Sequence, residues 1–535
     1  MSDSTTPFNA AEWLVDRHVR EGNGDRVALR CEGHDTTYSE LLDLIEQAQR
    51  GLVQLDVNPG ERVAMVMVDD PSFVAVFLGC LRSAVVPVPL STMLRGEALG
   101  DIIADSGAKA LFASAQFAPS IDTIVDAAPE LAHVVLAPSL DETAMAEVTD
   151  VAEQIDLWDL QGLGGVPIEG EASALGPALV AATTQDSPAF WLYSSGTTGT
   201  PKGVMHTHGN LPATVDTYAS QVLQVTPDDR FLSIAKLFFA YGLGNSLTFP
   251  LAIGATAILD PRPPTPATTT ALIDQEQATL FFASPGFVAA VLDAQPDPSI
   301  FASMRATVTA GESLPGPVQT RFTELTGRPV LDGIGSTELL HIFISNTLDE
   351  QTAGSSGRVV AGYAAELRND DDEVVTDPDT PGYLHVRGPS AAVGYWQRPE
   401  ADAAAFRDGW VRTGDVYTRS VDDTWTFLGR NNDMIKAGGI WVSPAEVESV
   451  LIEHPDVMEA AVVGARDDRG LEMTVAYVLP ATGSIPDHDE LEQHCRDRMA
   501  AFKRPRRIIT VDELPKTATG KIRRFELRDR FEQES

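Results

Sequence analysis

Residues 193–204 read Tyr193-Ser194-Ser195-Gly196-Thr197-Thr198-Gly199-Thr200-Pro201-Lys202-Gly203-Val204. They follow a short apolar run, Ala189 to Tyr193, that is typical of a buried β-strand. Glycines let the backbone approach a ligand closely, serine and threonine hydroxyls donate hydrogen bonds, and Lys202 adds a positive charge. The stretch therefore predicts a strand followed by a loop that binds phosphate.

Two other interpretations of this stretch are weaker. The Walker A loop has Ser or Thr directly after its Lys, whereas Lys202 is followed by Gly203. A Gly/Ser/Thr run is also typical of a flexible loop. The ordered set of hydroxyls, glycines and one lysine behind a strand favours the phosphate-binding interpretation.

Composition excludes several classes of protein. The chain has 535 residues, enough for two or more folding units, and 43% of them are hydrophobic. The net charge of −38 excludes non-specific nucleic-acid binding, which requires excess Lys and Arg. No apolar stretch has the length of a membrane span, and no secretory signal precedes the first domain. The three widely spaced cysteines indicate a reduced, cytoplasmic protein. We expect a monomer or a homodimer.

Strand-like apolar runs alternate with amphipathic segments up to about residue 430, which predicts α/β layers with mostly parallel sheets. Residues 62–68 and 85–90 are predicted strands, and residues 72–82 a predicted helix. After residue 430 the pattern changes to a small α/β unit, with a helix beginning after Ser443. We place two domains at residues 1–430 and 431–535.

Two further junctions combine a strand with a polar turn, at residues 309–315 (TAGESLP) and 331–338 (LDGIGSTE). In parallel sheets, ligands bind at the carboxyl ends of strands, where both turns are expected. Glu338 offers a hard oxygen ligand of the kind that Mg²⁺ prefers. Taken alone, each junction is as typical of a plain turn followed by a helix N-cap as it is of a ligand-binding turn.

Asp415 lies in a Thr-Gly-Asp turn a short distance before Arg430. A carboxylate can accept hydrogen bonds from both hydroxyls of a ribose, although Thr-Gly-Asp alone is an ordinary turn. Near the end of the chain, residues 515–522 (PKTATGKI) place Lys521 in a Gly/Thr loop. A fixed cation there would stabilise the negative charge that gathers on phosphorus during in-line attack.

Together these motifs resemble the signatures of the adenylate-forming superfamily, which includes acyl- and aryl-CoA ligases, peptide-synthetase adenylation domains and beetle luciferases. The resemblance covers essentially the whole chain. It implies an α/β fold with a large multi-layer N-terminal domain of mostly parallel sheets and a small mobile C-terminal α/β domain. It also implies that ATP converts a carboxylate into an acyl-adenylate, after which a thiol receives the acyl group.

The resemblance assigns roles to individual residues. Those that would bind the nucleotide are Ser194, Ser195, Gly196, Thr197, Thr198, Gly199, Lys202, Gly311, Glu312, Ser313, Asp332, Gly333, Thr337, Asp415 and Arg430. Thr198 and Glu338 would hold Mg²⁺, and Lys521 would reach the carboxylate and α-phosphate during adenylation.

For the thioester step, the resemblance assigns Lys436 as catalytic and Gly438 and Gly439 to the pantetheine arm of coenzyme A. Family members rotate the small domain between the two half-reactions. The usual pivot residue is Asp or Lys, whereas this chain has Asn432 at that position. Asn tolerates unusual backbone angles, so Asn432 is the predicted hinge.

Two segments, residues 235–245 (AKLFFAYGLGN) and 338–346 (ELLHIFISN), look like the acid-binding segments of benzoate-CoA ligases and their hydroxy- and aminobenzoate relatives. By that likeness, the residues around the aromatic ring are Phe239, Ala240, Tyr241, Gly242, Ile334, Gly335, His341 and Ile342. Two alternatives stay open: Phe238 and Phe239 as plain core residues, and His341 as a hydrogen-bonded wall residue. No Asp is present in the first segment to hold an α-ammonium, as peptide-synthetase domains require.

The sequence thus predicts an aryl-CoA ligase that uses an aromatic carboxylate, ATP, Mg²⁺ and coenzyme A. A second enzyme interpretation is a stand-alone domain that loads the aryl group onto a carrier protein. A third, from another class, is a catalytically silent nucleotide-binding or scaffold protein, which would have no need of the full set of motifs.

Overall fold

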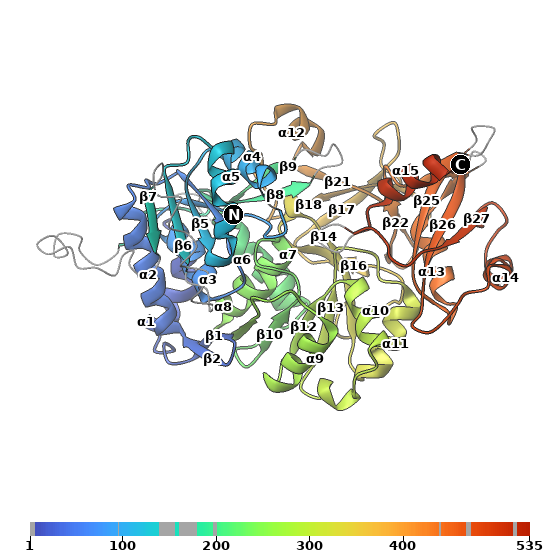
Figure 1. The fold of residues 1–535 in the computed structure, drawn as a ribbon, viewed down its shortest axis with the longest axis horizontal. Helices are drawn as coiled ribbons and strands as arrows, with labels where there is room; N and C mark the ends of the chain where they lie inside the picture. The colour runs from blue at the N-terminus through green and yellow to red at the C-terminus, as the bar shows by residue number, and fades with distance from the viewer. Residues whose placement is uncertain are drawn as a thin grey trace, which may run out of the picture. The chain divides into compact units, whose positions relative to one another are not determined.

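The computed structural model describes residues 6–94, 96–137, 156–159, 179–195, 201–437, 440–466, 472–516 and 522–534 (Figure 1). Contacts divide the chain into unit 1, residues 1–264, 336–341 and 389–403, and unit 2, residues 265–335, 342–388 and 404–535. The predicted domain boundary near residue 430 stays a prediction, because it describes which part of the chain moves and the contact division does not test movement.

The predicted alternation of strands and helices is confirmed at the start of unit 1. Strand β3 (Arg62–Val66), helix α3 (Pro71–Arg82) and strand β4 (Val86–Pro89) follow one another. Helix α3 begins where expected because the Asp70 side chain accepts a hydrogen bond from the Phe73 amide and Pro71 occupies the first turn. The parallel sheet has the order β4-β3-β5-β6-β7 and is completed by β5 (Ala108–Ser114), β6 (His133–Ala137) and β7 (Asp156–Asp159).

A second set of strands in unit 1 runs in the order β10-β11-β1-β2. Its parallel pairs are β10–β11 and β11–β1, and β2 is antiparallel to β1. The bounds are β1 (Val27–Cys31), β2 (His34–Thr37), β10 (Arg230–Ser233) and β11 (Thr256–Leu259). A third, antiparallel sheet has the order β19-β9-β8, with β8 (Pro188–Ser195), β9 (Pro201–Thr207) and β19 (Gly394–Tyr395).

The helical segments of unit 1 cover these sheets. They are η1 (Glu12–Asp16), α1 (Arg17–Arg20), α2 (Tyr38–Gln54), α4 (Glu97–Ser106), η2 (Ala115–Ser120), α5 (Ile121–Ala127), α6 (Asn210–Thr214), η5 (Val215–Ala219), α7 (Ala240–Leu243), η6 (Gly244–Thr248), α8 (Phe249–Ile253) and η8 (Thr337–Leu339). Helices α4 and α5 share a buried apolar cluster with β3 to β6, which Trp191 of β8 joins. This burial ties the strand before the predicted phosphate loop to the first parallel sheet.

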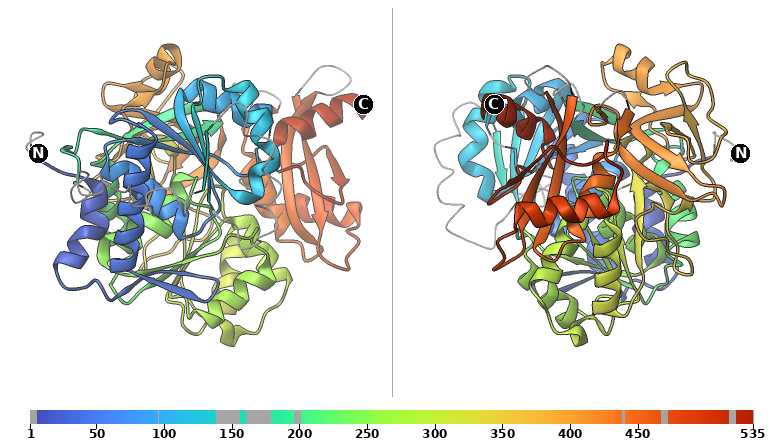
Figure 2. Two further views of the ribbon diagram at one scale, coloured as in Figure 1. Left: turned by 60° about the vertical axis from the view of Figure 1, so that its left-hand side comes forward. Right: turned by 90° about the vertical axis from the view of Figure 1, so that its right-hand side faces the viewer.

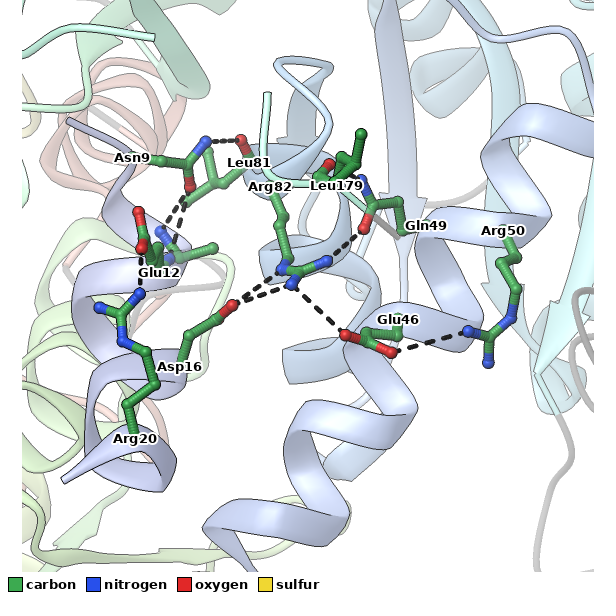
Figure 3. Close-up of polar contacts among 11 residues, drawn as sticks. Asn9, Glu12, Asp16, Arg20, Glu46, Gln49, Arg50, Leu81, Arg82 and Leu179 are labelled. Atoms are coloured by element: carbon green, nitrogen blue, oxygen red, sulfur yellow. Dashed lines mark hydrogen bonds and ion pairs between the residues drawn. The ribbon is translucent and has the colours of Figure 1, made fainter. Parts of the chain in front are cut away.

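A buried polar network holds η1 and α2 against α3 (Figure 3). The Arg82 guanidinium donates to Oδ1 of Asp16 at 2.9 Å and to the side-chain Oε1 of Gln49 at 2.6 Å. Glu46 lies 3.4 Å from the same guanidinium. Arg82 is 5% exposed and Asp16 7%, so removing the Arg82 charge would leave the Asp16 carboxylate buried without this cation.

Unit 2 contains strands in the order β16-β15-β14-β13-β12, of which β12, β13 and β14 are parallel. Their bounds are β12 (Leu280–Ala283), β13 (Ala306–Thr309), β14 (Val330–Gly335), β15 (Ile342–Ser345) and β16 (Arg358–Val359). The helical segments that accompany them are α9 (Pro266–Gln275), α10 (Pro285–Asp293), η7 (Pro298–Phe301) and α11 (Gly316–Thr326). The expected mostly parallel α/β class is confirmed.

Unit 2 also has an antiparallel sheet in the order β17-β18-β21-β20, with β22 paired to β21. Its strands are β17 (Ala364–Arg368), β18 (Gly382–Arg387), β20 (Phe406–Arg407), β21 (Trp410–Arg419) and β22 (Trp425–Arg430). An acidic turn follows β17, in which the Asn369 side chain accepts hydrogen bonds from the Asp371 and Glu373 amides. Helix α12 (Pro399–Ala405) precedes β20.

Residues after 430 form a small α/β arrangement, orange to red in Figures 1 and 2. The sheet order is β25-β26-β27, and helix α15 packs on it through Leu527 and Phe531, which contact Ala461 and Tyr477 in one buried cluster. Helix α13 begins as predicted, because the Ser443 hydroxyl accepts a hydrogen bond from the Glu446 amide. The elements are β23 (Ile435–Ala437), β24 (Ile440–Val442), α13 (Pro444–Ile452), β25 (Val457–Arg466), β26 (Glu472–Pro480), α14 (His488–Arg498), β27 (Arg507–Thr510) and α15 (Arg524–Glu534).

Candidate functional site

The strands on either side of the predicted phosphate loop pair with each other in unit 1. Ser194 lies opposite Lys202, and Ser195 lies opposite Pro201. The apolar strand therefore continues two residues beyond Tyr193, because cross-strand pairing with β9 extends it. The predicted loop residues Gly196, Thr197, Thr198 and Gly199 lie outside the described residues.

Lys202 contacts a residue that the sequence did not single out. Its ammonium lies 5.1 Å from the centre of the Tyr395 ring, within the range of a cation–π interaction. The contact arises because β19 pairs with β9, with Tyr395 opposite Val204, and because the Trp396 amide donates to the Gly203 carbonyl. The only sequence signal for Tyr395 was its place in an aromatic pair, Tyr395-Trp396, directly after Gly394.

The Thr337–Glu338 turn is held from several sides within unit 1. The Tyr395 hydroxyl donates to Oε1 of Glu338 at 2.8 Å. The Ala392 amide donates to the Glu338 carbonyl, and Nε2 of His206 donates to the Thr337 carbonyl at 2.9 Å. Burial lowers the pKa of His206 to about 4, so the ring is neutral at ordinary pH. The turn is therefore fixed while the half-buried Glu338 carboxylate remains partly accessible.

The residue after this turn directs His341 inward. Leu340 has a φ of 64°, an uncommon backbone conformation for a residue other than glycine. His341 is 3% exposed, and its Nε2 donates to Oδ1 of Asn245 at 3.1 Å. Burial lowers the pKa of His341 to about 3. A neutral His341 cannot supply a positive charge to a carboxylate, so its role would be that of a pocket wall.

Aromatic side chains surround His341. Its ring centroid lies 5.5 Å from that of Tyr241, 5.2 Å from that of Tyr218 and 4.5 Å from that of Phe249. Gly244 lies beneath it, and a Cβ at that position would be 2.3 Å from Cδ2 of His341. The structure thus brings two predicted ring-contacting residues, Tyr241 and His341, together, and adds Gly244 and Asn245, which the sequence reasoning missed.

The remaining predicted acid-contacting residues have different environments. Phe238 is 5% exposed and is a core residue, whereas its neighbour Phe239 is only half-buried. Gly242 is buried, with no room for a side chain, because a Cβ would lie 2.1 Å from the Lys236 carbonyl oxygen. Ala240, like Phe239, is half-buried. In unit 2, Gly335 and Ile342 are cross-strand partners and Ile334 is half-buried on the same strand, β14.

The two polar junctions of unit 2 lie at the carboxyl ends of adjacent parallel strands, as expected. Thr309 ends β13 and is the register partner of Asp332 on β14. The Thr309 hydroxyl donates to Oδ1 of Asp332 at 2.8 Å. Burial raises the pKa of Asp332 to about 8, against the opposing effect of its hydrogen bonds. Gly333 follows on β14, and Gly311 (φ 94°), Glu312 and Ser313 form the exposed to half-buried turn after β13.

Asp415 and Arg430 are brought together by the β21–β22 hairpin, in which they are register partners. Nε of Arg430 lies 3.1 Å from Oδ1 of Asp415, and Nη1 donates to the Thr413 carbonyl at 3.0 Å. The Asp415 side chain is 4% exposed and that of Arg430 is 43% exposed. The spacing of the two residues in the sequence therefore reflects hairpin register.

The predicted hinge is contacted by the last helix, α15. Arg528 donates to the Asn432 carbonyl at 3.3 Å and pairs with Asp433 at 3.0 Å. Lys436 lies on β23. The other predicted residues of this region, Gly438, Gly439 and Lys521, lie outside the described residues, so their roles stay predictions.

No helix in the described part of the chain is both long and apolar enough to cross a membrane. Comparison with protein families gives two matches, one over residues 15–396 to the family described as AMP-binding enzyme and one over residues 446–521 to AMP-binding enzyme C-terminal domain.

Individual relatives cover the chain almost completely. The sequence is 38% identical over 527 residues to a benzoate–CoA ligase of Thauera aromatica, covering 97% of this chain and 96% of that protein. It is 32% identical over 525 residues to a p-hydroxybenzoic acid–AMP ligase of Mycobacterium tuberculosis, covering 97% of this chain and 68% of that protein. The crystal structure of a benzoate CoA ligase from Burkholderia xenovorans LB400 superposes with a TM-score of 0.86 at 38% identity, covering 97% of this chain and 100% of that one.

Proposed function

Because this chain belongs to the AMP-binding enzyme family, we propose that it is an ATP-dependent aryl-CoA ligase of the benzoate-CoA ligase type. The observation that carries the proposal is similarity to a benzoate–CoA ligase along the whole length of both chains. In the first half-reaction, a carboxylate oxygen of the aromatic acid attacks the α-phosphorus of ATP and pyrophosphate leaves. In the second, the thiolate of coenzyme A attacks the acyl carbon and AMP leaves.

We assign the acid to the region around Tyr241 and His341. An aromatic wall with a neutral histidine suits an uncharged ring, and Gly244 lets the His341 ring pack directly against the backbone. A neutral His341 forms no ion pair with the carboxylate of the acid. Such an ion pair would stabilise the bound acid as much as the transition state and would therefore not speed the reaction.

The donor set around Glu338 fits Mg²⁺. Oε1 accepts from Tyr395, and among the described residues none donates a hydrogen bond to Oε2. A carboxylate oxygen is the type of ligand that Mg²⁺ takes, and the Thr198 hydroxyl would be a second one. When bound with ATP, Mg²⁺ neutralises charge on the phosphates.

The other nucleotide-binding residues keep the roles that the resemblance gave them. Lys202 would bind phosphate, Asp415 the ribose hydroxyls, and Lys521 the charge that develops at the α-phosphate. Lys436, Gly438 and Gly439 would serve the thioester step, with Asn432 as the hinge between residues 1–430 and 431–535.

A pyrophosphate-exchange assay with a panel of acids tests the function. The panel contains benzoate, hydroxy-, amino- and halobenzoates, cyclohexyl acids and medium-chain fatty acids. We expect exchange with aromatic acids, and aryl-CoA detectable by mass spectrometry when coenzyme A is added. Exchange with none of these acids would contradict the proposal and favour a catalytically silent nucleotide-binding protein.

The division of labour between the two lysines has its own test. Lys521→Ala should abolish most adenylation but leave thioester formation from supplied aryl-AMP. Lys436→Ala should have the reverse effect. Loss of both half-reactions in either variant would contradict the assignment.

A second candidate function is loading of the aryl group onto a carrier protein. The similarity to a p-hydroxybenzoic acid–AMP ligase favours it, because that relative is named for the adenylate and not for a CoA thioester. Acid-dependent pyrophosphate exchange without any aryl-CoA product would support this alternative over the CoA ligase.

A further inference from the structure

Tyr395 lies between the two charged groups of unit 1 that the proposed function assigns to ATP and its metal ion. Its hydroxyl donates to Oε1 of Glu338 at 2.8 Å, and its ring centre lies 5.1 Å from the Lys202 ammonium. One side chain therefore engages an anion through its hydroxyl and a cation through its ring.

The backbone fixes Tyr395 in this place. Strand β19 pairs with β9, so the Tyr395 backbone lies opposite Val204. The Ala392 amide donates to the Glu338 carbonyl at 2.8 Å, which joins the same segment to the metal-binding turn. Two connections thus link this segment to the Glu338 turn, one through the main chain and one through the Tyr395 hydroxyl.

The chemistry of the hydroxyl suits this position. The phenol hydroxyl carries one proton, and an ionised carboxylate has none to give, so the Tyr395 hydroxyl donates to Glu338. The Glu338 carboxylate is thereby held in one orientation.

We propose that Tyr395 is a positioning residue for the adenylation step, one that orients Glu338 toward the metal ion and holds Lys202 beside it. By taking Oε1, the hydroxyl leaves Oε2 of Glu338 to the metal. By offering its ring to Lys202, it holds the ammonium through a contact that uses no carboxylate oxygen. This inference rests on the proposed function, because it assumes that Glu338 is the metal ligand.

The chain provides a matched control. In unit 2 the Tyr383 hydroxyl donates to Asp370 at 2.6 Å, and the Arg412 guanidinium lies 5.0 Å from the Tyr383 ring centre. This trio has the same three kinds of group, a carboxylate, a tyrosine and a cation. Asp370 belongs to an exposed hairpin turn with no assigned role. Tyr383→Phe therefore shows how the loss of a tyrosine hydroxyl that binds a carboxylate affects the protein at a position outside the proposed active site.

The test compares Tyr395→Phe with Tyr383→Phe in the full-length protein. The first readout is the affinity of Mn²⁺ for the enzyme–ATP complex, followed by the loss of the free Mn²⁺ signal in electron paramagnetic resonance. A hydrogen bond to a charged group is expected to change affinity about tenfold. We expect Tyr395→Phe to weaken Mn²⁺ binding by about that factor and Tyr383→Phe to leave it unchanged.

The second readout is catalytic. Tyr395→Phe should raise the Mg²⁺ concentration needed for half-maximal pyrophosphate exchange, while the KM for the aromatic acid and thioester formation from supplied aryl-AMP stay at wild-type values. Tyr395→Leu, which also removes the ring, should in addition raise the KM for ATP. If Tyr395 acts through Glu338, the double variant of Tyr395→Phe and Glu338→Gln should bind Mn²⁺ no more weakly than Glu338→Gln alone.

The outcomes separate this inference from the proposed function. Unchanged Mn²⁺ affinity in Tyr395→Phe overturns the inference even if the wild type is an active ligase. A lower melting temperature in Tyr395→Phe with unchanged metal dependence also overturns it, because the tyrosine would then be only structural. A wild type without acid-dependent exchange contradicts the proposed function, while the Mn²⁺ comparison still decides the role of Tyr395.

Discussion

Glu338 in unit 1 and Asp415 in unit 2 are both carboxylates at predicted nucleotide motifs, yet they have opposite surroundings. Glu338 is half-buried and accepts a hydrogen bond from a neutral tyrosine hydroxyl. Asp415 is almost fully buried and pairs with the Arg430 guanidinium at 3.1 Å. Within the described residues, the side chain that binds the Glu338 carboxylate is therefore neutral, whereas the one that pairs with Asp415 is a cation.

This difference matches the two ligand groups that we assign to them. A metal ion brings its own positive charge, so a carboxylate that binds it works best without a competing cation. Ribose hydroxyls are neutral donors, so a carboxylate that binds them can be neutralised by an arginine and still accept hydrogen bonds. The four predictions below test this contrast, beginning with the largest expected effect.

Replacing Glu338 should have the largest effect. Glu338→Gln removes the charge for the metal, and we expect acid-dependent pyrophosphate exchange to fall by roughly 100- to 1,000-fold. A titration of Mg²⁺ in the exchange assay measures both the rate and the metal dependence. Glu350→Gln, which alters an exposed carboxylate paired with Arg358, is the control and should behave like wild type. Equal metal dependence in the two variants would contradict the assignment of Glu338.

Replacing Asp415 should have a smaller effect with a different signature. Asp415→Asn retains one acceptor oxygen for the ribose, so we expect the KM for ATP to rise by about 10- to 30-fold. The Mg²⁺ concentration for half-maximal exchange should not change, which initial-rate measurements at varied ATP and Mg²⁺ would show. A shift in metal dependence as large as that of Glu338→Gln would remove the distinction between the two carboxylates.

Gly244→Ala tests the acid pocket of unit 1, because the added Cβ would lie 2.3 Å from Cδ2 of His341 and the ring would have to move. We expect kcat/KM for the aromatic acid to fall about tenfold, with an unchanged KM for ATP. Gly316→Ala in unit 2 is the control, since its Cβ would meet no atom closer than 3.6 Å. Steady-state kinetics with both substrates varied would reveal a nucleotide effect, which would argue against a pocket role.

The smallest effect is a pH dependence of stability, opposite in sign for His341 and Asp332. The pKa of His341 is lowered to about 3, so below pH 6.5 the unfolded chain takes up a proton that the folded one does not, and stability is lost as pH falls. The pKa of Asp332 is raised to about 8, so its contribution is present below pH 3.8 and is lost as pH rises through 8.

The free energy of unfolding of wild type relative to that of His341→Asn should decrease by about 1.4 kcal/mol per pH unit as the pH falls from 6 to 4. Thermal unfolding of both proteins at each pH measures this. A difference in melting temperature that is independent of pH would mean that His341 titrates alike in the folded and unfolded states.

Much of the fold was predictable because the signals were local. The start of α13 at Pro444 followed from an N-cap and a proline in the first turn. The alternation that identified β3, α3 and β4 likewise depends on residues close together in the sequence. The adjacency of Thr309 and Asp332 followed from one rule, that parallel strands present their carboxyl ends at the same edge.

The candidate site was predictable only where a motif was continuous. Glu338, Asp415 and Lys202 could be named from short patterns, and the spacing of Asp415 and Arg430 reflects a hairpin, which is a local structure. Asn245 and Gly244 could not be named, because their importance comes from His341, which arrives from a distant part of the chain. Burial places Phe238 in the core, whereas the role of Phe239 at the aromatic ring stays a prediction.

The sequence by itself determined the family, the α/β class and the residue types of the chemistry, because these are encoded in short patterns and in composition. The tertiary structure decided which charges are neutralised and which remain available. Tyr395 reaches Glu338 across 57 positions of the chain through the pairing of β19 with β9. Such a contact depends on how strands from separate segments pack, and no local pattern of residues specifies that packing.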